Sequence, residues 1–305
     1  MTFLDQSHRA TPTGAKKLLH LNWSLVLLLS AVSAVGFLML TSVAGGNVDR
    51  WAEPQMTRFA LGLGVMFVVA LIHIRFWRMV TPLAYLAGIA LLLYVDFFGA
   101  VGMGAQRWID LGFMRLQPSE LMKIALVMML ALYYDWLDPK KVSNPIWVAV
   151  PLILTLLPMA LVLKQPDLGT SILLAAGGGV VMFMAGVSIW YFVAAFASGG
   201  SLIWAVMASR GTEWQILKDY QYRRIETFVD PSLDPLGAGY HITQSKIALG
   251  SGGLSGRGYM EGSQSRLNFL PEKHTDFIFT TLAEEFGFVG GIALLTLYAL
   301  IVIFA

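Results

Sequence analysis

Long apolar segments, each bounded by charges, glycines or prolines, recur along the whole 305-residue chain. About 20 consecutive apolar residues cross the roughly 30 Å hydrocarbon layer of a membrane as a helix. The pattern therefore predicts an all-α fold, a polytopic transmembrane helix bundle of eight spans that forms a single membrane domain over residues 1–305. The predicted spans are residues 22–42, 56–74, 79–99, 118–135, 146–163, 169–187, 190–208 and 277–304.

One connection, residues 209–276, is far longer than the others. Structureless loops of that length are uncommon in compact domains and are usually functional or disordered. Aromatic and aliphatic residues occur throughout this one, and residues 241–249 form an apparent amphipathic helix that Gly250 ends. We therefore predict a folded cap rather than a disordered loop.

The distribution of basic residues predicts the orientation. Residues 1–21 are polar and carry three basic residues ahead of an apolar segment without a cleavage site, which is typical of an uncleaved signal anchor. Lysine and arginine are in modest excess in the short segments that share the side of this N-terminal segment. We therefore expect a cytoplasmic N-terminal segment and an extracytoplasmic loop at 209–276. The chain stops at Ala305 within its last apolar run, so we expect it to be truncated.

The composition excludes several classes of function. Hydrophobic residues make up 56% of the chain and charged residues 13%, with a mean hydropathy of +0.66. The net charge of +2 and the lack of a basic cluster exclude nucleic acid as a partner, and leave the membrane, its lipids and other membrane proteins. The chain has no cysteine, and its five histidines lack ligand spacing, so a zinc site has no support.

Charged residues near the ends of predicted spans are functional candidates, because a charge at membrane depth costs about 2.5 to 3.5 kcal/mol on insertion scales. Glu120 and Lys123 are three residues apart, so they share a helix face and can form an ion pair. A purely structural salt bridge is the alternative. Asp96, Lys164 and Asp167 lie at the same predicted outer face.

Two pairs of arginines are candidate anion sites. Arg107 and Arg115 precede a predicted helix that Ser119 could cap, and a helix N-terminus with arginine binds anions. Anchoring at the lipid headgroups is the alternative. Arg223 and Arg224 are adjacent in the long loop, where they could clamp a pyrophosphate or remain a solvated pair.

The end of the long loop combines glycines with a carboxylate. Residues 250–258 resemble a phosphate-binding loop only superficially, since no lysine motif follows, and a flexible turn is the simpler interpretation. Asp276 directly precedes an apolar helix, as either its N-cap or an outward-facing carboxylate. Glu284 and Glu285 lie in that helix, and at least one must face a polar interior.

Several of these stretches together resemble the shape, elongation, division and sporulation (SEDS) family of bacterial membrane proteins. The resemblance runs from the first span to the end of the chain, and the first of its motifs favours the elongation branch over the division branch. The motifs are GAQRWIDLG at 104–112, QPSELMKIA at 117–125, QPDLGTS at 165–171, DPLGAGYHITQSKIALGSGGLSGRGY at 234–259 and LPEKHTDFIF at 270–279.

The resemblance implies a ten-span protein of the bacterial cytoplasmic (inner) membrane, of which this chain would contain eight spans. It implies a peptidoglycan glycosyltransferase that polymerises lipid II at the outer membrane face during cell elongation. It also implies a class B penicillin-binding protein as the transpeptidase partner, within the elongation machinery.

The resemblance also implies roles for individual residues. The motif with Asp276 supplies the family's essential carboxylate, and we expect Asp276 to accept the proton of the acceptor hydroxyl. The pyrophosphates would be held by Arg107, Lys123, Arg223 or Arg224, with Glu120 orienting Lys123. A metal site is unknown; Mg²⁺ or Mn²⁺ bridging a pyrophosphate and a carboxylate stays open.

Two other classes of function stay open. A lipid II flippase or transporter would use helices broken at Pro158 and at the glycines of 177–179 and 199–200, although small residues also serve close helix packing. A non-catalytic scaffold of the cell-wall synthase is the third interpretation, and the early chain end motivates it.

Overall fold

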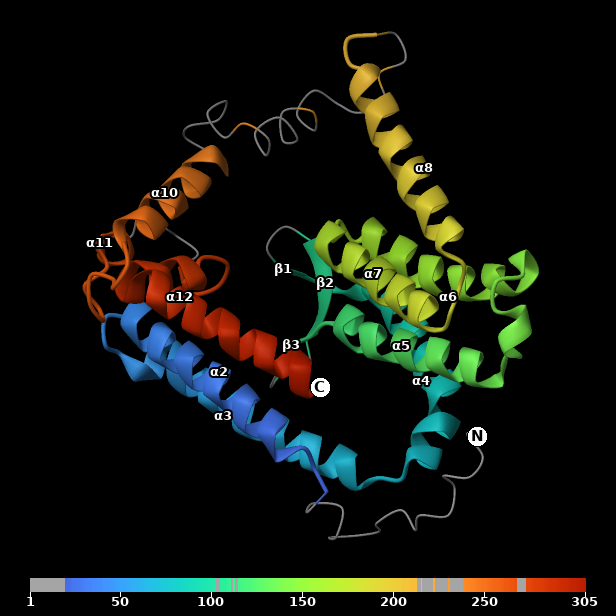
Figure 1. Cartoon of the computed structure of the whole chain (residues 1–305), viewed down its shortest axis with the longest axis horizontal. Coiled ribbons are helices and arrows are strands. Elements are labelled where there is room, and N and C mark those ends of the chain that lie inside the picture. Colours follow the sequence, from blue (N-terminus) through green and yellow to red (C-terminus); the bar gives the residue numbers. More distant parts are fainter. Residues whose placement is uncertain are drawn as a thin grey trace. The chain divides into compact units, whose positions relative to one another are not determined.

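The computed structural model describes residues 20–102, 105–110, 112, 115–212, 215, 222, 230, 238–267 and 273–305. These residues are mostly helical and belong to two compact units. The first unit takes its residues from Met1–Leu71 and Val206–Ala305, and the second from Ile72–Ala205. We describe each unit by itself (Figure 1).

Three long helices form the body of the first unit. They are α2 (Trp23–Val43), α3 (Val48–Leu71) and α12 (Ile278–Phe304), and α2 packs against both of the others (Figure 1). Two helices from the long connection join them, α10 (Ala238–Ser251), which packs on α12, and the single turn α11 (Ser263–Arg266). A helix at the predicted residues 241–249 is therefore confirmed, but it begins earlier and continues through Gly250 to Ser251, so the predicted end at Gly250 was wrong.

Helix α3 begins eight residues before its predicted start. The Asn47 side chain accepts a hydrogen bond from the Asp49 amide at 3.0 Å, and Asp49 lies in the first turn, where a negative charge suits the helix dipole. Pro54 lies inside the helix. This polar first part places Arg50 and Trp51 on a helix rather than in a connection.

The second unit is built from consecutive helices. They are α4 (Ile74–Phe98), α5 (Pro118–Trp136), the 3₁₀ turn η2 (Pro139–Lys141), α6 (Pro145–Lys164), α7 (Leu168–Met184) and α8 (Ile189–Ala208). Helices α4, α5, α6 and α7 enclose an apolar core of Leu92, Met122, Leu126, Leu130 and Leu174, all at most 1% exposed.

Three short strands connect α4 to α5, and the sequence did not predict them. Strands β1 (Ala100–Gly102), β2 (Ala105–Asp110) and β3 (Arg115–Leu116) form an antiparallel sheet in chain order. The predicted N-cap of the next helix was wrong. Gln117 is the N-cap of α5 and Pro118 takes the first helical position, which its fixed φ favours, so Ser119 is buried inside the first turn.

The predicted helix bundle of a multi-pass membrane protein is confirmed. Each of the eight predicted spans coincides with a helix, and among the described residues six helices are long and apolar enough to cross a membrane: α2, α3, α4, α6, α8 and α12. Helix α7 is apolar but 17 residues long, and α5 carries Glu120, Lys123 and Asp135. The number of eight spans therefore stays a prediction.

Candidate functional site

A pocket of about 860 Å³ opens in the first unit, a size typical of small-molecule sites. The end of α2, the start of α3, the segment around α11 and the turn before α12 surround it. We call it the large pocket; it is lined by Ser42, Val43, Ala44, Gly45, Arg50, Trp51, Tyr259, Met260, Glu261, Arg266, Lys273, His274 and Glu285.

Basic groups and an aromatic pair form much of the large pocket. The rings of Trp51 and His274 stack at 4.6 Å, and the Arg50 guanidinium lies 4.4 Å from the centre of the Trp51 ring. Burial, and then the nearby charge of Arg50, lower the pKa of Lys273 from its ordinary value. With Arg266, these groups make a site suited to an anion that carries a flat or cyclic group.

This basic cluster was not predicted from the sequence, and Arg50, Arg266 and Lys273 were not among the candidate site residues. The available signal was the capped start of α3, which places Arg50 and Trp51 on a helix. The other three partners come from distant parts of the chain, so no local motif joins them.

A smaller pocket of about 360 Å³ shares Trp51 and His274 with the large pocket. Its other lining comes from α2, α3 and the start of α12 and includes Phe37, Leu40 and Ile278. These side chains suit a hydrocarbon chain, and the shared pair of rings lies at the border between the polar and the more apolar space.

Asp276 lies two residues after His274 and directly after Thr275, which lines the smaller pocket, and it is exposed. It does not cap α12, because Phe277 is the N-cap residue and makes no side-chain capping bond. Within the described part of the chain, no hydrogen bond or ion pair engages the Asp276 carboxylate. The N-cap interpretation was therefore wrong, and the carboxylate is available for chemistry beside the His274 and Thr275 lining.

Helix α12 is broken at Gly287, and the glycine-rich segment 252–258 fills the break. Gly287 has a φ of 64°, so the α12 carbonyls of residues 284 and 285 lose their partners at 288 and 289. The amides of residues 257 and 258 donate to those carbonyls, both at 3.0 Å, and the amides of 288 and 289 donate to the carbonyls of 253 and 254, at 2.9 and 3.1 Å. We call this exchange the backbone clip.

The glycines are required by the close approach of two backbones. A Cβ on Gly252 would lie 2.0 Å from the carbonyl oxygen of Ala283, and one on Gly256 would lie 2.1 Å from that of Glu285. The predicted turn is confirmed, and four hydrogen bonds hold it on α12. A phosphate-binding loop would need the amides of residues 257 and 258, but both already donate to carbonyls of α12.

Two adjacent carboxylates are buried beneath the clip. Glu284 is 0% exposed, and its Oε1 accepts from the Ser263 hydroxyl at 3.0 Å and from the Ser251 hydroxyl at 3.5 Å. Glu285 is 2% exposed, and its Oε1 accepts from the Ser42 hydroxyl. The expectation that at least one of them faces a polar interior is confirmed, since both contact hydroxyls and Glu285 lines the large pocket.

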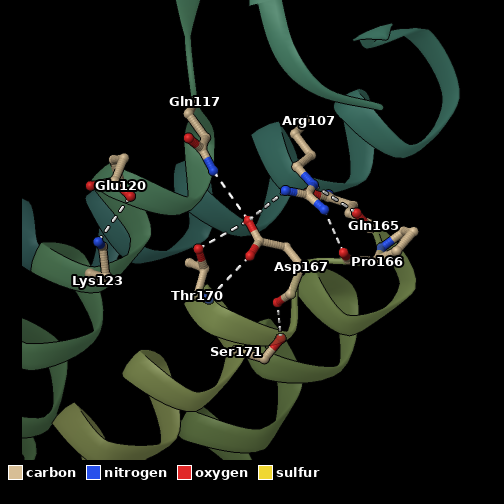
Figure 2. Close-up of polar contacts among 9 residues, drawn as sticks. All are labelled: Arg107, Gln117, Glu120, Lys123, Gln165, Pro166, Asp167, Thr170 and Ser171. Atoms are coloured by element: carbon tan, nitrogen blue, oxygen red, sulfur yellow. Dashed lines mark hydrogen bonds and ion pairs between the residues drawn. The ribbon is translucent and has the colours of Figure 1, made fainter. Parts of the chain in front are cut away.

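In the second unit, Asp167 is the centre of a network around the QPDLGTS motif (Figure 2). It caps α7 by accepting bonds from the Thr170 amide at 3.1 Å and hydroxyl at 3.0 Å, and it accepts from Gln117 Nε2 at 3.3 Å. Arg107 Nη1 lies 3.7 Å from Asp167 Oδ2. The motif thus joins the start of α7 to the connection before α5.

Arg107 is held by the same turn. Its Nε donates to the Gln165 carbonyl at 3.1 Å and its Nη2 to the Pro166 carbonyl (Figure 2). With the Asp167 contact, all three guanidinium nitrogens have a partner. These contacts support a structural role, and the predicted role of Arg107 as a pyrophosphate ligand stays a prediction.

The predicted pairing of Glu120 with Lys123 is confirmed. Lys123 Nζ lies 2.9 Å from Glu120 Oε1 in the first turns of α5, with side chains 31% and 55% exposed respectively (Figure 2). The ammonium keeps donors open to solvent, because one carboxylate oxygen satisfies only part of its capacity. Arg223 and Arg224 lie outside the described residues.

The structure assigns Asp276 to the first unit and Arg107, Glu120 and Lys123 to the second. Within the described ranges, no three His, Cys, Asp or Glu side chains come together as a group that could hold a metal ion.

The chain is similar to known proteins over nearly its whole length. Residues 18–305 match the family of FtsW, RodA and SpoVE, described as cell cycle proteins. The peptidoglycan glycosyltransferase MrdB of Escherichia coli K12 is 44% identical over 285 residues, which are 93% of this chain and 74% of the relative. A probable peptidoglycan glycosyltransferase FtsW of Thiomicrospira cyclica is 36% identical over 289 residues, 92% of this chain and 72% of the relative.

Solved structures agree with these relatives. A chain from a study of structural coordination of polymerization and crosslinking by a peptidoglycan synthase complex matches with a TM-score of 0.74 and 31% identity, over 92% of this chain and 76% of that one. The rod shape determining protein RodA of Thermus thermophilus matches with a TM-score of 0.58 and 28% identity, over 92% and 72%. The chain therefore belongs to the FtsW, RodA and SpoVE family of membrane proteins.

Proposed function

We propose that this protein is a peptidoglycan glycosyltransferase of the bacterial inner membrane that polymerises lipid II into glycan strands during cell elongation. The observation that carries the proposal is Asp276, an exposed carboxylate that does not cap its helix and lies two residues after His274, which lines the basic large pocket. The names of relatives that match over most of the chain support the same activity.

The reaction needs a base and a place for a leaving diphosphate. The 4-hydroxyl of the acceptor sugar attacks the anomeric carbon of the donor, the bond to the diphosphate breaks, and the hydroxyl proton leaves. Asp276 takes that proton in our proposal. One displacement without a covalent intermediate inverts the anomeric centre, which agrees with an α-linked donor and a β-linked product.

Cations stabilise the charge that develops on the diphosphate. We assign this role first to Arg50 and Lys273, because both line the large pocket, where burial and then the nearby charge of Arg50 lower the pKa of Lys273. Lys123, oriented by Glu120, together with Arg107, Arg223 and Arg224, stays a predicted set of further ligands. The smaller pocket would take the first isoprenoid units next to the diphosphate.

The membrane orientation and the partner follow from this activity. Lipid II is used at the outer face, so we place the N-terminal segment in the cytoplasm and Asp276 outside. We also propose a class B penicillin-binding protein as the partner, since one similar chain comes from a peptidoglycan synthase complex described as coordinating polymerization and crosslinking. Mg²⁺ or Mn²⁺ brought by the substrate would supply further positive charge for the leaving diphosphate, and Asp276 is the carboxylate that could hold it.

The test is reconstitution in liposomes with the penicillin-binding partner and labelled lipid II. Moenomycin is included to silence classical glycosyltransferases, and glycan chains are read on a gel. Polymer from the wild type and none from Asp276→Asn is the expected result. Lipid translocation that survives Asp276→Asn, without polymer from the wild type, would favour a flippase. A wild type that shows neither polymer nor translocation would favour the scaffold interpretation.

A further inference from the structure

Glu285 lines the large pocket, although its side chain is almost completely buried, at 2% exposed. Its Oε1 accepts from Ser42, and the backbone of Met260 approaches the same carboxylate. Its Oε2 has no hydrogen-bond partner within the described part of the chain. A buried acceptor left without a donor costs free energy, so this atom points to a ligand.

The surroundings of Glu285 are held in place from several sides. Met260 has a φ of 64°, a backbone conformation that non-glycine residues adopt uncommonly, and it lines the pocket beside the carboxylate. The backbone clip fixes the Glu285 carbonyl through the amide of residue 258 at 3.0 Å. The acceptor is therefore positioned by its neighbours before any ligand arrives, which lowers the cost of binding.

The other groups of the pocket indicate what kind of donor fits. Arg50, Arg266 and Lys273 supply positive charge for an anionic group, and the stacked Trp51 and His274 rings offer a flat apolar surface. A molecule that fits all three features has an anionic part, a ring face and a hydroxyl or amide N–H to donate. The pocket suits an anion better than a bare metal ion, because Arg50, Arg266 and Lys273 line it and no three His, Cys, Asp or Glu side chains of the described residues form a group that could hold a metal.

We infer that Glu285 Oε2 accepts a hydrogen bond from a hydroxyl or acetamido N–H of the sugar next to the diphosphate of the lipid-linked substrate. This inference rests on the proposed function and adds a substrate-binding residue that is separate from Asp276. The cations hold the diphosphate, Glu285 holds the sugar, and Asp276 takes the proton. Glu285 thus distinguishes a glycosylated lipid diphosphate from the bare lipid diphosphate.

The experiment compares two lipids and two variants. Equilibrium binding of radiolabelled lipid II and of undecaprenyl diphosphate, which has no sugar, is measured for the full chain in nanodiscs. Glu285→Gln replaces one carboxylate oxygen with an NH₂ group that donates and cannot accept, so it should weaken lipid II binding about tenfold and leave undecaprenyl diphosphate unchanged. Lys273→Ala should weaken both.

Glu284→Gln is the matched control, because Glu284 is the adjacent carboxylate, is as deeply buried, and does not line the pocket. It should change thermal stability without changing either affinity. If Glu285→Gln does not fold, Glu285→Asp is measured instead. It keeps the carboxyl group but is one methylene shorter, so its oxygen lies farther from the substrate, and the same selective loss of lipid II binding is expected.

An equal loss for both lipids, or no loss for either, would overturn the assignment. The proposed function fails by a different result: a wild-type protein that binds lipid II with the expected selectivity but makes no glycan. A Glu285 variant that polymerises as well as the wild type at low lipid II concentration contradicts only the inference that Glu285 binds the sugar.

Discussion

The backbone clip can be tested by adding a single methyl group to it. In Gly256→Ala, the new Cβ would lie 2.1 Å from the Glu285 carbonyl oxygen and 2.4 Å from its carbon, both backbone atoms that cannot turn aside. Gly256 also has a φ of 82°, which alanine adopts only with strain. The segment must therefore move away from α12.

The expected loss has two parts. The left-handed backbone costs alanine about 1 to 2 kcal/mol. Separation also breaks the bonds from the amides of residues 257 and 258 to α12, each worth about 0.5 to 1.5 kcal/mol, so about 1 to 3 kcal/mol more is lost. The free energy of unfolding should fall by about 2 to 5 kcal/mol in total.

Gly253→Ala is the control for the first part. Gly253 has a φ of 54°, but a Cβ there meets nothing within 4 Å, so only the backbone cost of about 1 to 2 kcal/mol applies. Equilibrium unfolding of both variants in mixed detergent micelles gives the two free energies. The clip is refuted if Gly256→Ala is no more destabilising than Gly253→Ala.

Three further predictions concern other contacts. Asp167→Ala removes the cap of α7 and should lower the unfolding free energy by about 1 to 2 kcal/mol, with a smaller loss for Asp167→Asn. Equal stability of the wild type and Asp167→Ala would contradict the network. Gly178→Ala puts a Cβ 2.5 Å from the Thr155 side chain and should lower the unfolding free energy by about 1 to 3 kcal/mol. Gly177→Ala has open space around its Cβ and should leave stability unchanged. A thermal melt that ranks the two variants the other way argues against close packing of α6 and α7. Lipid II binding should weaken as the pH rises through the lowered pKa of Lys273, because the ammonium then loses its charge. Lys273→Arg should remove this pH-dependent step. A Lys273→Arg variant with the same pH profile as the wild type would refute the assignment.

Periodicity and length predicted the long helices, because burial in lipid requires an apolar stretch of defined size. Boundaries were predicted less well where polar residues continue a helix. The turn of α3 that holds Arg50 and Trp51 reads as a polar connection, and only the cap by Asn47 indicates that it is helical. The strands before α5 have only three, six and two residues, which is too short to give a clear alternating pattern.

The candidate site was predictable only where its residues are neighbours in the sequence. The pair of Glu120 and Lys123 follows from helix geometry, and the motif with Asp276 marked its carboxylate. The large pocket joins α2, α3, the α11 segment and the turn before α12, so its basic cluster depends on tertiary contacts. The contact between the glycines of 252–258 and the break in α12 could not be predicted for the same reason, because it joins distant parts of the chain.

The most direct test of the central claim is the turnover number of Asp276→Asn at saturating lipid II, with lipid II affinity measured on the same sample. Asparagine keeps the size of the side chain and removes the base. If Asp276 takes the hydroxyl proton, kcat falls by about 10² to 10⁴ while the affinity for lipid II stays within a few-fold of the wild type. A variant that polymerises at the wild-type rate would contradict the account.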